Sequence, residues 1–112
     1  MSRRALAGTG ALALAIAALV PAVALGGAST ASTHSVVLKS TRFHPGTMTI
    51  NRGDSVQWLW RDGTDHNVTF HSFHSKTKET GSYTIRFTHS GAFSYRCTIH
   101  ESEGMRGKII VH

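Results

Sequence analysis

The sequence contains a single cysteine, Cys97, among its 112 residues. One cysteine cannot form a disulfide within the chain, so no internal covalent cross-link is available to stabilise the fold. In an oxidising compartment a free thiol is a chemical liability unless it is buried, paired with another chain or bound to a metal. The surroundings of Cys97 are therefore the first feature of this sequence that needs an explanation.

The sequence after residue 31 also lacks helical periodicity, internal repeats and low-complexity tracts. Instead, short stretches alternate between apolar and polar residues, with turn-forming residues about every eight to twelve positions. The clearest alternation places Tyr83, Ile85 and Phe87 on one face. This pattern predicts an all-β fold, an antiparallel sandwich or barrel of about seven strands. The expected strands are 35–40, 47–51, 55–61, 66–70, 83–88, 93–97 and 106–112, with a turn at 43–46 and a polar loop or short helix at 71–80.

A long apolar run occurs at residues 11–25. Basic residues precede it and small residues follow it, which is the layout of a secretory signal. We expect residues 1–31 to be a signal peptide and residues 32–112 to be an exported domain, which is secreted, periplasmic or on the outer face of the cytoplasmic membrane. An uncleaved membrane anchor is the alternative, because the run approaches the roughly 20 residues of a spanning helix. Arg3 and Arg4 resemble part of a twin-arginine signal, so the Sec and Tat routes both stay open.

Negative charge is scarce, since six acidic residues stand against twelve basic ones. Without Arg3 and Arg4, the domain at 32–112 would keep ten basic residues and a net charge of +4. These basic residues are scattered along the sequence, which argues against a surface that binds nucleic acid. An anionic surface or an acidic protein partner remains compatible with the charge.

Four side chains carry metal-binding chemistry. Cys97, His100 and Met105 lie in one short segment between two alternating runs, and His66 follows a glycine-containing turn upstream. A thiolate, two imidazoles and a thioether are a ligand combination that suits copper. The predicted strands direct Cys97 inward and place His66 at the same end of the sandwich if their strands are neighbours. The imidazoles and the thiolate would then form a trigonal plane with Met105 on its axis, as in a blue-copper site.

The neighbours of these four residues form a longer pattern, which resembles the copper loop and flanking strands of plastocyanins and pseudoazurins. The resemblance spans nearly all of the domain. It implies a cupredoxin fold, a Greek-key β-sandwich, with one type 1 copper ion bound by His66, Cys97, His100 and Met105. It also implies that Asn67 braces the Cys97 loop through hydrogen bonds. The matching residues are Tyr95, Cys97, His100, Gly104, Met105, Gly107, Ile109 and Val111, with Phe43, Pro45, Gly53, Asp54, Val56, Trp58, His66, Asn67 and Val68 upstream.

One position departs from the family pattern. The residue before the loop histidine is commonly proline in these proteins, and here it is Ile99. Ile99 has a backbone N–H that proline lacks, and a hydrogen bond from it to the Cys97 sulfur would shift the reduction potential. This departure affects the tuning of the site and leaves the ligand set unchanged.

The resemblance implies a protein that carries single electrons between partners outside the cytoplasm by Cu(I)/Cu(II) cycling, with electrons leaving through the exposed edge of His100. It implies that the protein is not an enzyme and that it binds redox partner proteins transiently. The positive net charge suggests that these partners are acidic, and a monomer is the default for such a carrier. A copper storage or delivery module is the alternative, in which His71 and His74 could form a second metal site instead of being solvated loop residues. A metal-free adhesion domain is a further alternative. A Cys–His nucleophile is another, but the sequence shows no evident residue to orient the histidine and no oxyanion loop.

Overall fold

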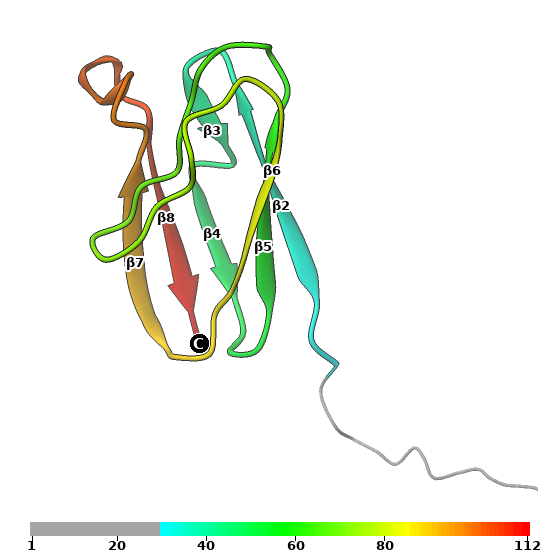
Figure 1. The fold of residues 1–112 in the computed structure, drawn as a ribbon. Helices are drawn as coiled ribbons and strands as arrows, with labels where there is room; N and C mark the ends of the chain where they lie inside the picture. The colour runs from blue at the N-terminus through cyan, green and yellow to red at the C-terminus, as the bar shows by residue number, and fades with distance from the viewer. Residues whose placement is uncertain (1–29) are drawn as a thin grey trace, which may run out of the picture. The chain divides into compact units, whose positions relative to one another are not determined.

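The computed structural model describes residues 30–112, so residues 1–29, and with them most of the predicted signal peptide, lie outside the described residues. Residues 31–112 form one compact unit (Figure 1). Across residues 30–112 the structure holds no helix with the length and apolar character needed to cross a membrane. The elements are β2 (Thr33–Lys39), β3 (Arg42–His44), β4 (Thr47–Ile50), β5 (Ser55–Trp60), β6 (Gly81–Arg86), β7 (Gly91–Arg96), the 3-10 helix η2 (Glu101–Glu103) and β8 (Arg106–Val111).

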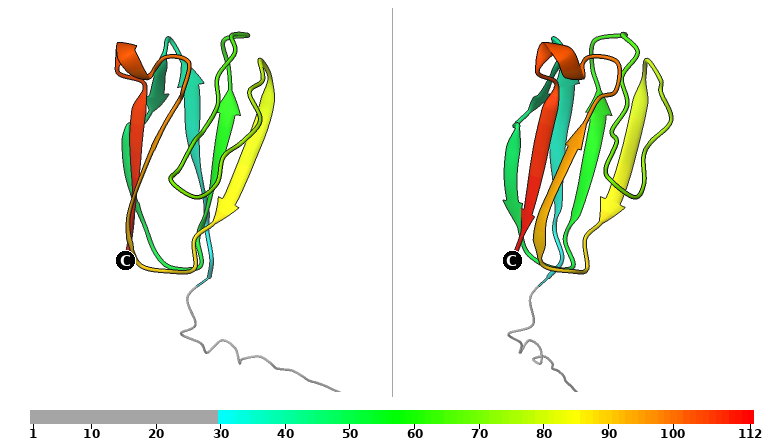
Figure 2. Two further views of the ribbon diagram at one scale, coloured as in Figure 1. Left: turned by 60° about the vertical axis from the view of Figure 1, so that its left-hand side comes forward. Right: turned by 90° about the vertical axis from the view of Figure 1, so that its left-hand side faces the viewer.

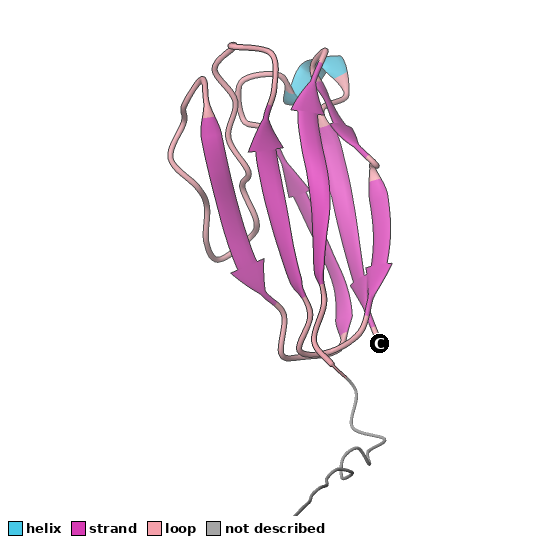
Figure 3. Ribbon diagram, turned by 90° about the vertical axis from the view of Figure 1, so that its right-hand side faces the viewer, coloured by secondary structure: helices cyan, strands magenta, loops and turns pink. Residues whose placement is uncertain are grey.

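The strands form two sheets that face each other (Figures 2 and 3). One sheet has the strand order β3-β2-β5-β6 and the other β4-β8-β7. β3 and β4 belong to different sheets, so the chain crosses from one sheet to the other at Pro45 and Gly46. The predicted all-β sandwich of about seven strands is confirmed.

Two strand pairs are parallel, which differs from the antiparallel sandwich that was predicted. β2 lies parallel to β5 and β4 lies parallel to β8, while the remaining neighbours are antiparallel. The cause is the crossing, because β3 and β4 run one after the other in the same direction in opposite sheets (Figure 1). The chain then returns as β5 in the direction of β2. Apolar alternation has the same period in both kinds of pairing, so it carries no information about strand direction.

The core lies between the sheets and is centred on Trp58, which is fully buried in the middle of β5. Val56 and Trp60 share its inward face, as the alternation predicts. The rings of Tyr95 and Phe70 meet Trp58 edge-on, with centroids at 5.4 and 5.7 Å. Burial of each large apolar side chain contributes roughly 2–3 kcal/mol. The aromatic cluster therefore gives β7 a rigid support close to its end.

β7 and β8 approach each other closely where Tyr95 pairs with Gly107. A Cβ atom on Gly107 would lie only 2.3 Å from Cζ of Tyr95, so a side chain at this position has no room beneath the ring. This contact fixes the two strands against each other just before the loop that joins them. That loop carries Cys97, His100 and Met105.

Residues 66–70 do not form the continuous strand that was predicted. They make isolated bridges instead, His66 with Lys78, and Thr69 with both His74 and Arg96. The partners are a loop on one side and the end of β7 on the other, so no ladder can propagate. His66 and Val68 are nevertheless fully buried, which explains the apolar pattern that suggested a strand.

Two further segments differ from the sequence-based expectation. The turn expected at 43–46 is shorter, because β3 includes Phe43, whose side chain is buried in the core. Residues 101–103 form the helix η2, which alternation did not indicate, and Gly104 ends it with a φ of 91°. The polar segment 71–80 is a loop, as one of the two expectations had it.

Candidate metal centre

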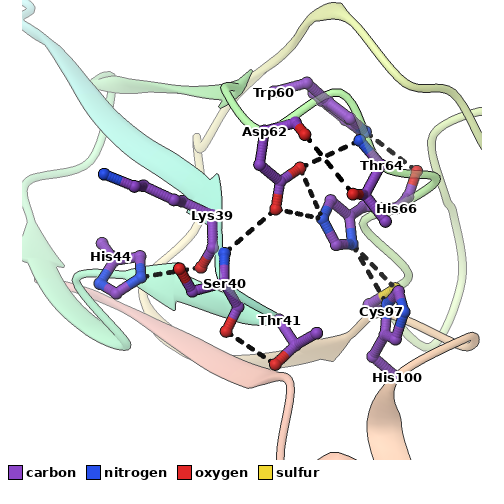
Figure 4. A network of polar contacts seen from close by, with 10 residues as sticks. All are labelled: Lys39, Ser40, Thr41, His44, Trp60, Asp62, Thr64, His66, Cys97 and His100. Carbon is purple, nitrogen blue, oxygen red and sulfur yellow. Dashed lines mark hydrogen bonds and ion pairs between the residues drawn. The ribbon is translucent and has the colours of Figure 1, made fainter.

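Three of the predicted ligands, His66, Cys97 and His100, converge at one end of the sandwich (Figure 4). The Nδ1 atoms of the two histidines are 3.2 Å apart. The Cys97 Sγ atom lies 4.0 Å from Nδ1 of His66 and 3.7 Å from Nδ1 of His100. A point equidistant from these three atoms is about 2 Å from each, close to the usual bond length between a first-row metal ion and an imidazole nitrogen. The spacing therefore fits one metal ion shared by the three donors.

The loop between β7 and β8 brings Cys97 and His100 together. The Cys97 N–H donates to the Met105 carbonyl at 3.1 Å, which closes the loop at its base. The His100 carbonyl accepts N–H groups from Glu103 at 2.9 Å and from Met105 at 3.2 Å, so the short helix folds back onto His100. The left-handed conformation of Gly104 makes this reversal possible at no steric cost.

His66 reaches the site from the segment that follows β5. Its main chain exchanges two hydrogen bonds with Lys78, at 3.0 and 3.1 Å. Its carbonyl also accepts a hydrogen bond from the indole N–H of Trp60 at 3.0 Å. Because the side chain is fully buried as well, the position of the ring is fixed from several sides.

Asp62 determines which nitrogen of His66 faces the site (Figure 4). Its carboxylate lies 3.1 Å from His66 Nε2 and accepts the N–H groups of Ser40 at 3.0 Å and Thr64 at 3.1 Å. Burial raises the pKa of the Asp62 carboxyl, but the hydrogen bonds from His66, Thr64 and Ser40 together hold it below its ordinary value. An ionised carboxylate can only accept, so Nε2 carries the proton and Nδ1 presents its lone pair to Cys97 and His100.

Asn67 connects the His66 segment to the residue after Cys97. Its side-chain oxygen accepts the Thr98 N–H at 3.0 Å and the Thr69 hydroxyl at 2.8 Å. Its side-chain nitrogen donates to the hydroxyls of Thr98 at 2.8 Å and Thr77 at 3.0 Å. Two of these bonds link the His66 segment to the Cys97 loop and one links it to the loop at 71–80, whereas the bond from Thr69 stays within the His66 segment. These are contacts through which Asn67 could brace the site.

Met105 is fully buried and lies directly across the base of the loop from Cys97, through the hydrogen bond between their main chains. Its main chain is thus adjacent to that of Cys97, one of the three converging donors. Its role as the axial ligand stays a prediction.

Exposure differs among the donors. His66 and Cys97 are fully buried, whereas His100 is partly exposed. Ile99, directly before His100, is 45% exposed. The centre is therefore shielded on the inside and reaches the surface on the His100 side, next to an apolar residue.

The described residues contain one group of three or more metal-ligating side chains with this spacing, and neither His71 nor His74 belongs to it. The ring Nδ1 of His74 lies 2.8 Å from the Ser75 carbonyl, to which it donates. No cluster within residues 30–112 therefore supports the second metal site that the sequence allowed.

Asp62 is a residue of the site that was not predicted from the sequence. Its only signal was the four-residue spacing from His66, which has no meaning outside a helix. The contact depends on the turn after β5 and on the main chain of Ser40, which comes from a different part of the sheet. Such a contact is visible only in three dimensions.

Comparison with known proteins gives an independent result. Residues 30–112 match the family model described as copper binding proteins, plastocyanin/azurin family. The chain is 36% identical over 83 residues to the chloroplastic plastocyanin of Tetradesmus obliquus, a match that covers 62% of this chain and 57% of that protein. It is 34% identical over 67 residues to the amicyanin of Paracoccus denitrificans, covering 53% of this chain and 50% of that protein. The chain thus spans about half the length of these two relatives.

Solved structures give the same result. A variant of amicyanin with Cu(I) superposes with a TM-score of 0.66 at 26% identity, covering 71% of this chain and 82% of that one. An oxidised amicyanin variant superposes with a TM-score of 0.65, also at 26% identity, covering 70% and 81%. The family match includes the whole sandwich and all three converging donors, and it confirms the resemblance to cupredoxins. The chain belongs to the copper-binding plastocyanin/azurin family.

Proposed function

We propose that this protein is a type 1 copper electron carrier, which passes single electrons between redox partners outside the cytoplasm. The observation that carries the proposal is the convergence of one thiol and two imidazole nitrogens within 4.0 Å of one another. Bound copper would supply the one-electron couple between Cu(I) and Cu(II). Membership of a copper-binding family agrees with this donor set.

In this proposal His66, Cys97 and His100 would hold the copper ion, and the Met105 thioether would be a fourth, weaker ligand. The tautomer of His66 supports its role, because the Asp62 contact leaves Nδ1 free to bind a metal. Burial of Met105 beside Cys97 supports the fourth ligand. The chemistry of this set, with one soft thiolate and two imidazoles, suits copper better than magnesium or calcium.

The role of the surrounding protein is to keep the donors in place in both oxidation states. The hydrogen bonds of Asp62 and Asn67, together with the loop closed by Cys97 and Met105, hold the donors without help from the metal. Because the ligands do not need to move when the oxidation state changes, the reorganisation that slows electron transfer is small. The partly exposed His100, next to Ile99, is the proposed exit for the electron.

The remaining properties follow from the same proposal. Residues 1–31 act as an export signal, or as an uncleaved anchor that would tie the domain to a membrane, and residues 32–112 form the working domain. The protein acts as a monomer, docks transiently with redox partners and transforms no substrate. Copper storage or delivery would instead require more than one copper ion per chain, which metal analysis of the loaded protein distinguishes.

The test is the absorption spectrum of the purified protein after addition of Cu(II). A thiolate bound to Cu(II) gives an intense blue charge-transfer band, so the loaded protein should be blue with one copper ion per chain. Cys97→Ser should remove the band while weaker copper binding remains. A colourless wild-type protein, or a blue Cys97→Ser variant, would overturn the proposal.

A further inference from the structure

A hollow on the outer face of the β4-β8-β7 sheet lies beside the metal centre. Its volume is about 470 Å³, and it opens between the start of β4 and the ends of β7 and β8 that adjoin the loop. The basic residues looked scattered in the sequence, but the fold gathers three of them here. The charged residues of the hollow are Arg96, Glu101, Arg106 and Lys108.

Three of these charged residues are sequence neighbours of the proposed copper ligands. Arg96 ends β7 directly before Cys97, and Arg106 begins β8 directly after Met105, so alternation at these strand ends turns each arginine away from its buried neighbour. Glu101 follows His100 at the start of η2. The hollow therefore lies on the outside of the same segments whose inner side holds the metal centre. The neighbouring pairs are Arg96 and Cys97, Glu101 and His100, and Arg106 and Met105.

Arg96 and Arg106 are paired directly across β7 and β8, which by itself is an unfavourable contact between like charges. Glu101 relieves it, with Oε1 at 3.1 Å from Arg96 Nε and Oε2 at 3.0 Å from Arg106 Nη2. Each guanidinium uses one nitrogen in its ion pair with the Glu101 carboxylate. The other N–H donors remain available, and the two side chains are 42% and 66% exposed.

Lys108 adds a third positive charge to the hollow. Within residues 30–112 no carboxylate forms an ion pair with it, and it is exposed. Three basic residues against one acidic residue leave the hollow with an excess of two positive charges. Guanidinium groups with unused donors bind carboxylates in a bidentate geometry, which gives direction as well as affinity.

We propose that this hollow docks a carboxylate-rich surface of the protein with which this chain exchanges electrons. The inference rests on the proposed function, because it names the chemistry of the partner. Charge complementarity and the unused donors carry it. A partner bound here lies against the strands and the loop that hold the centre, which is where an electron-transfer complex needs its contact.

The experiment is a titration of the isotopically labelled, copper-loaded and reduced protein with a hexaglutamate peptide at low salt, followed through backbone amide shifts. The shifts should concentrate at residues 94–96, 101 and 106–108 and fade as salt is added. Lys108→Glu should weaken binding about five- to tenfold, because an exposed attraction becomes a repulsion. Arg52→Glu is the matched control, with the same charge change in the turn between β4 and β5 at the opposite end (Figure 1), and should weaken binding less than about twofold.

Equal weakening by the two variants would show that only net charge matters and would overturn the inference. Shifts at other residues, or tighter binding of inorganic phosphate than of the peptide at the hollow, would overturn it as well. The outcome is separate from that of the proposed function. If the peptide does not bind at the hollow, the Cu(II) protein should still be blue. If the copper assignment is wrong, the blue absorption should be absent while the peptide still binds.

Discussion

Two contacts between a histidine and an aspartate occur within residues 30–112, and they lie at opposite ends of the sandwich. Nε2 of His34 lies 3.0 Å from Asp54, and Nε2 of His66 lies 3.1 Å from Asp62. In the first pair the carboxylate is buried and the histidine is 33% exposed. In the second pair the histidine is fully buried and the carboxylate is 21% exposed.

The difference lies in what the buried member faces. Asp54 accepts the backbone N–H groups of Ser32 and Asn51, so its burial stabilises the chain near the start of β2 and the turn before β5. The second nitrogen of His66 faces Cys97 and His100 instead. A histidine–aspartate contact therefore indicates a metal centre only where the free nitrogen meets further donors.

The largest expected effect separates the two histidines. His66→Gln removes a proposed ligand, so the blue absorption should vanish. Cu(II) affinity should fall more than about a hundredfold, which is the largest loss expected when only a residue that hydrogen-bonds to a ligand is changed. His34→Gln should leave both unchanged. Absorption spectra and copper titrations of the two variants check this, and an unchanged spectrum in His66→Gln would refute the ligand assignment.

A smaller effect separates the two aspartates. Asp62→Asn keeps an oxygen that can accept the His66 N–H but removes the negative charge that strengthens the imidazole as a ligand. Cu(II) affinity should fall about ten- to hundredfold and the reduction potential should rise, because Cu(II) depends more on the charge than Cu(I) does. Asp54→Asn is the matched control and should change neither quantity. Equal changes in both variants would contradict the distinction between the pairs.

The loss of folding stability in acid should depend on Asp54, the aspartate that has no role at the metal centre. Hydrogen bonds from the Ser32 N–H, His34 and the Asn51 N–H lower the pKa of Asp54 from 3.8 to about 2, despite burial. A carboxyl with a depressed folded-state pKa stabilises the fold above its unfolded value and loses that contribution as pH falls. The urea midpoint of the metal-free protein should therefore drop between about pH 4 and pH 2. The drop should be weaker in Asp54→Asn, and an identical pH profile would contradict this account.

The smallest effect concerns tuning at the metal end alone. Ile99→Pro removes a backbone N–H next to His100, and if that N–H donates to the Cys97 sulfur, its loss should lower the reduction potential. We expect a shift below about 60 mV, the equivalent of a tenfold change for one electron. Voltammetry of the blue protein measures it, and an unchanged potential would show that this N–H does not reach the sulfur.

Much of the fold could be predicted because its strands alternate cleanly. Val56, Trp58 and Trp60 lie on one buried face as expected, and the residues of β6 and β7 alternate as predicted. Strand direction could not be predicted, since alternation is the same in parallel and antiparallel pairs. The segment at 66–70 was mistaken for a strand because it is buried, and burial shapes a sequence whether or not a ladder forms.

The donor residues of the candidate site could be predicted from the sequence, but the residue that orients His66 could not. Cys97, His100 and Met105 are close in sequence, and a short loop limits how far apart they can lie. Asp62 could not be found, because its contact with His66 depends on the turn that brings Ser40 to the same carboxylate. The hollow was missed for the same reason, since Arg96 and Arg106 are ten residues apart and meet only through strand register.

The proposed copper centre requires three donor atoms to share one ion. The most direct measurement is the anomalous diffraction signal of copper in crystals of the loaded protein. We expect one strong peak about 2 Å from Nδ1 of His66, Nδ1 of His100 and Sγ of Cys97. A peak at any other group of side chains, with these three atoms left free, would contradict the account.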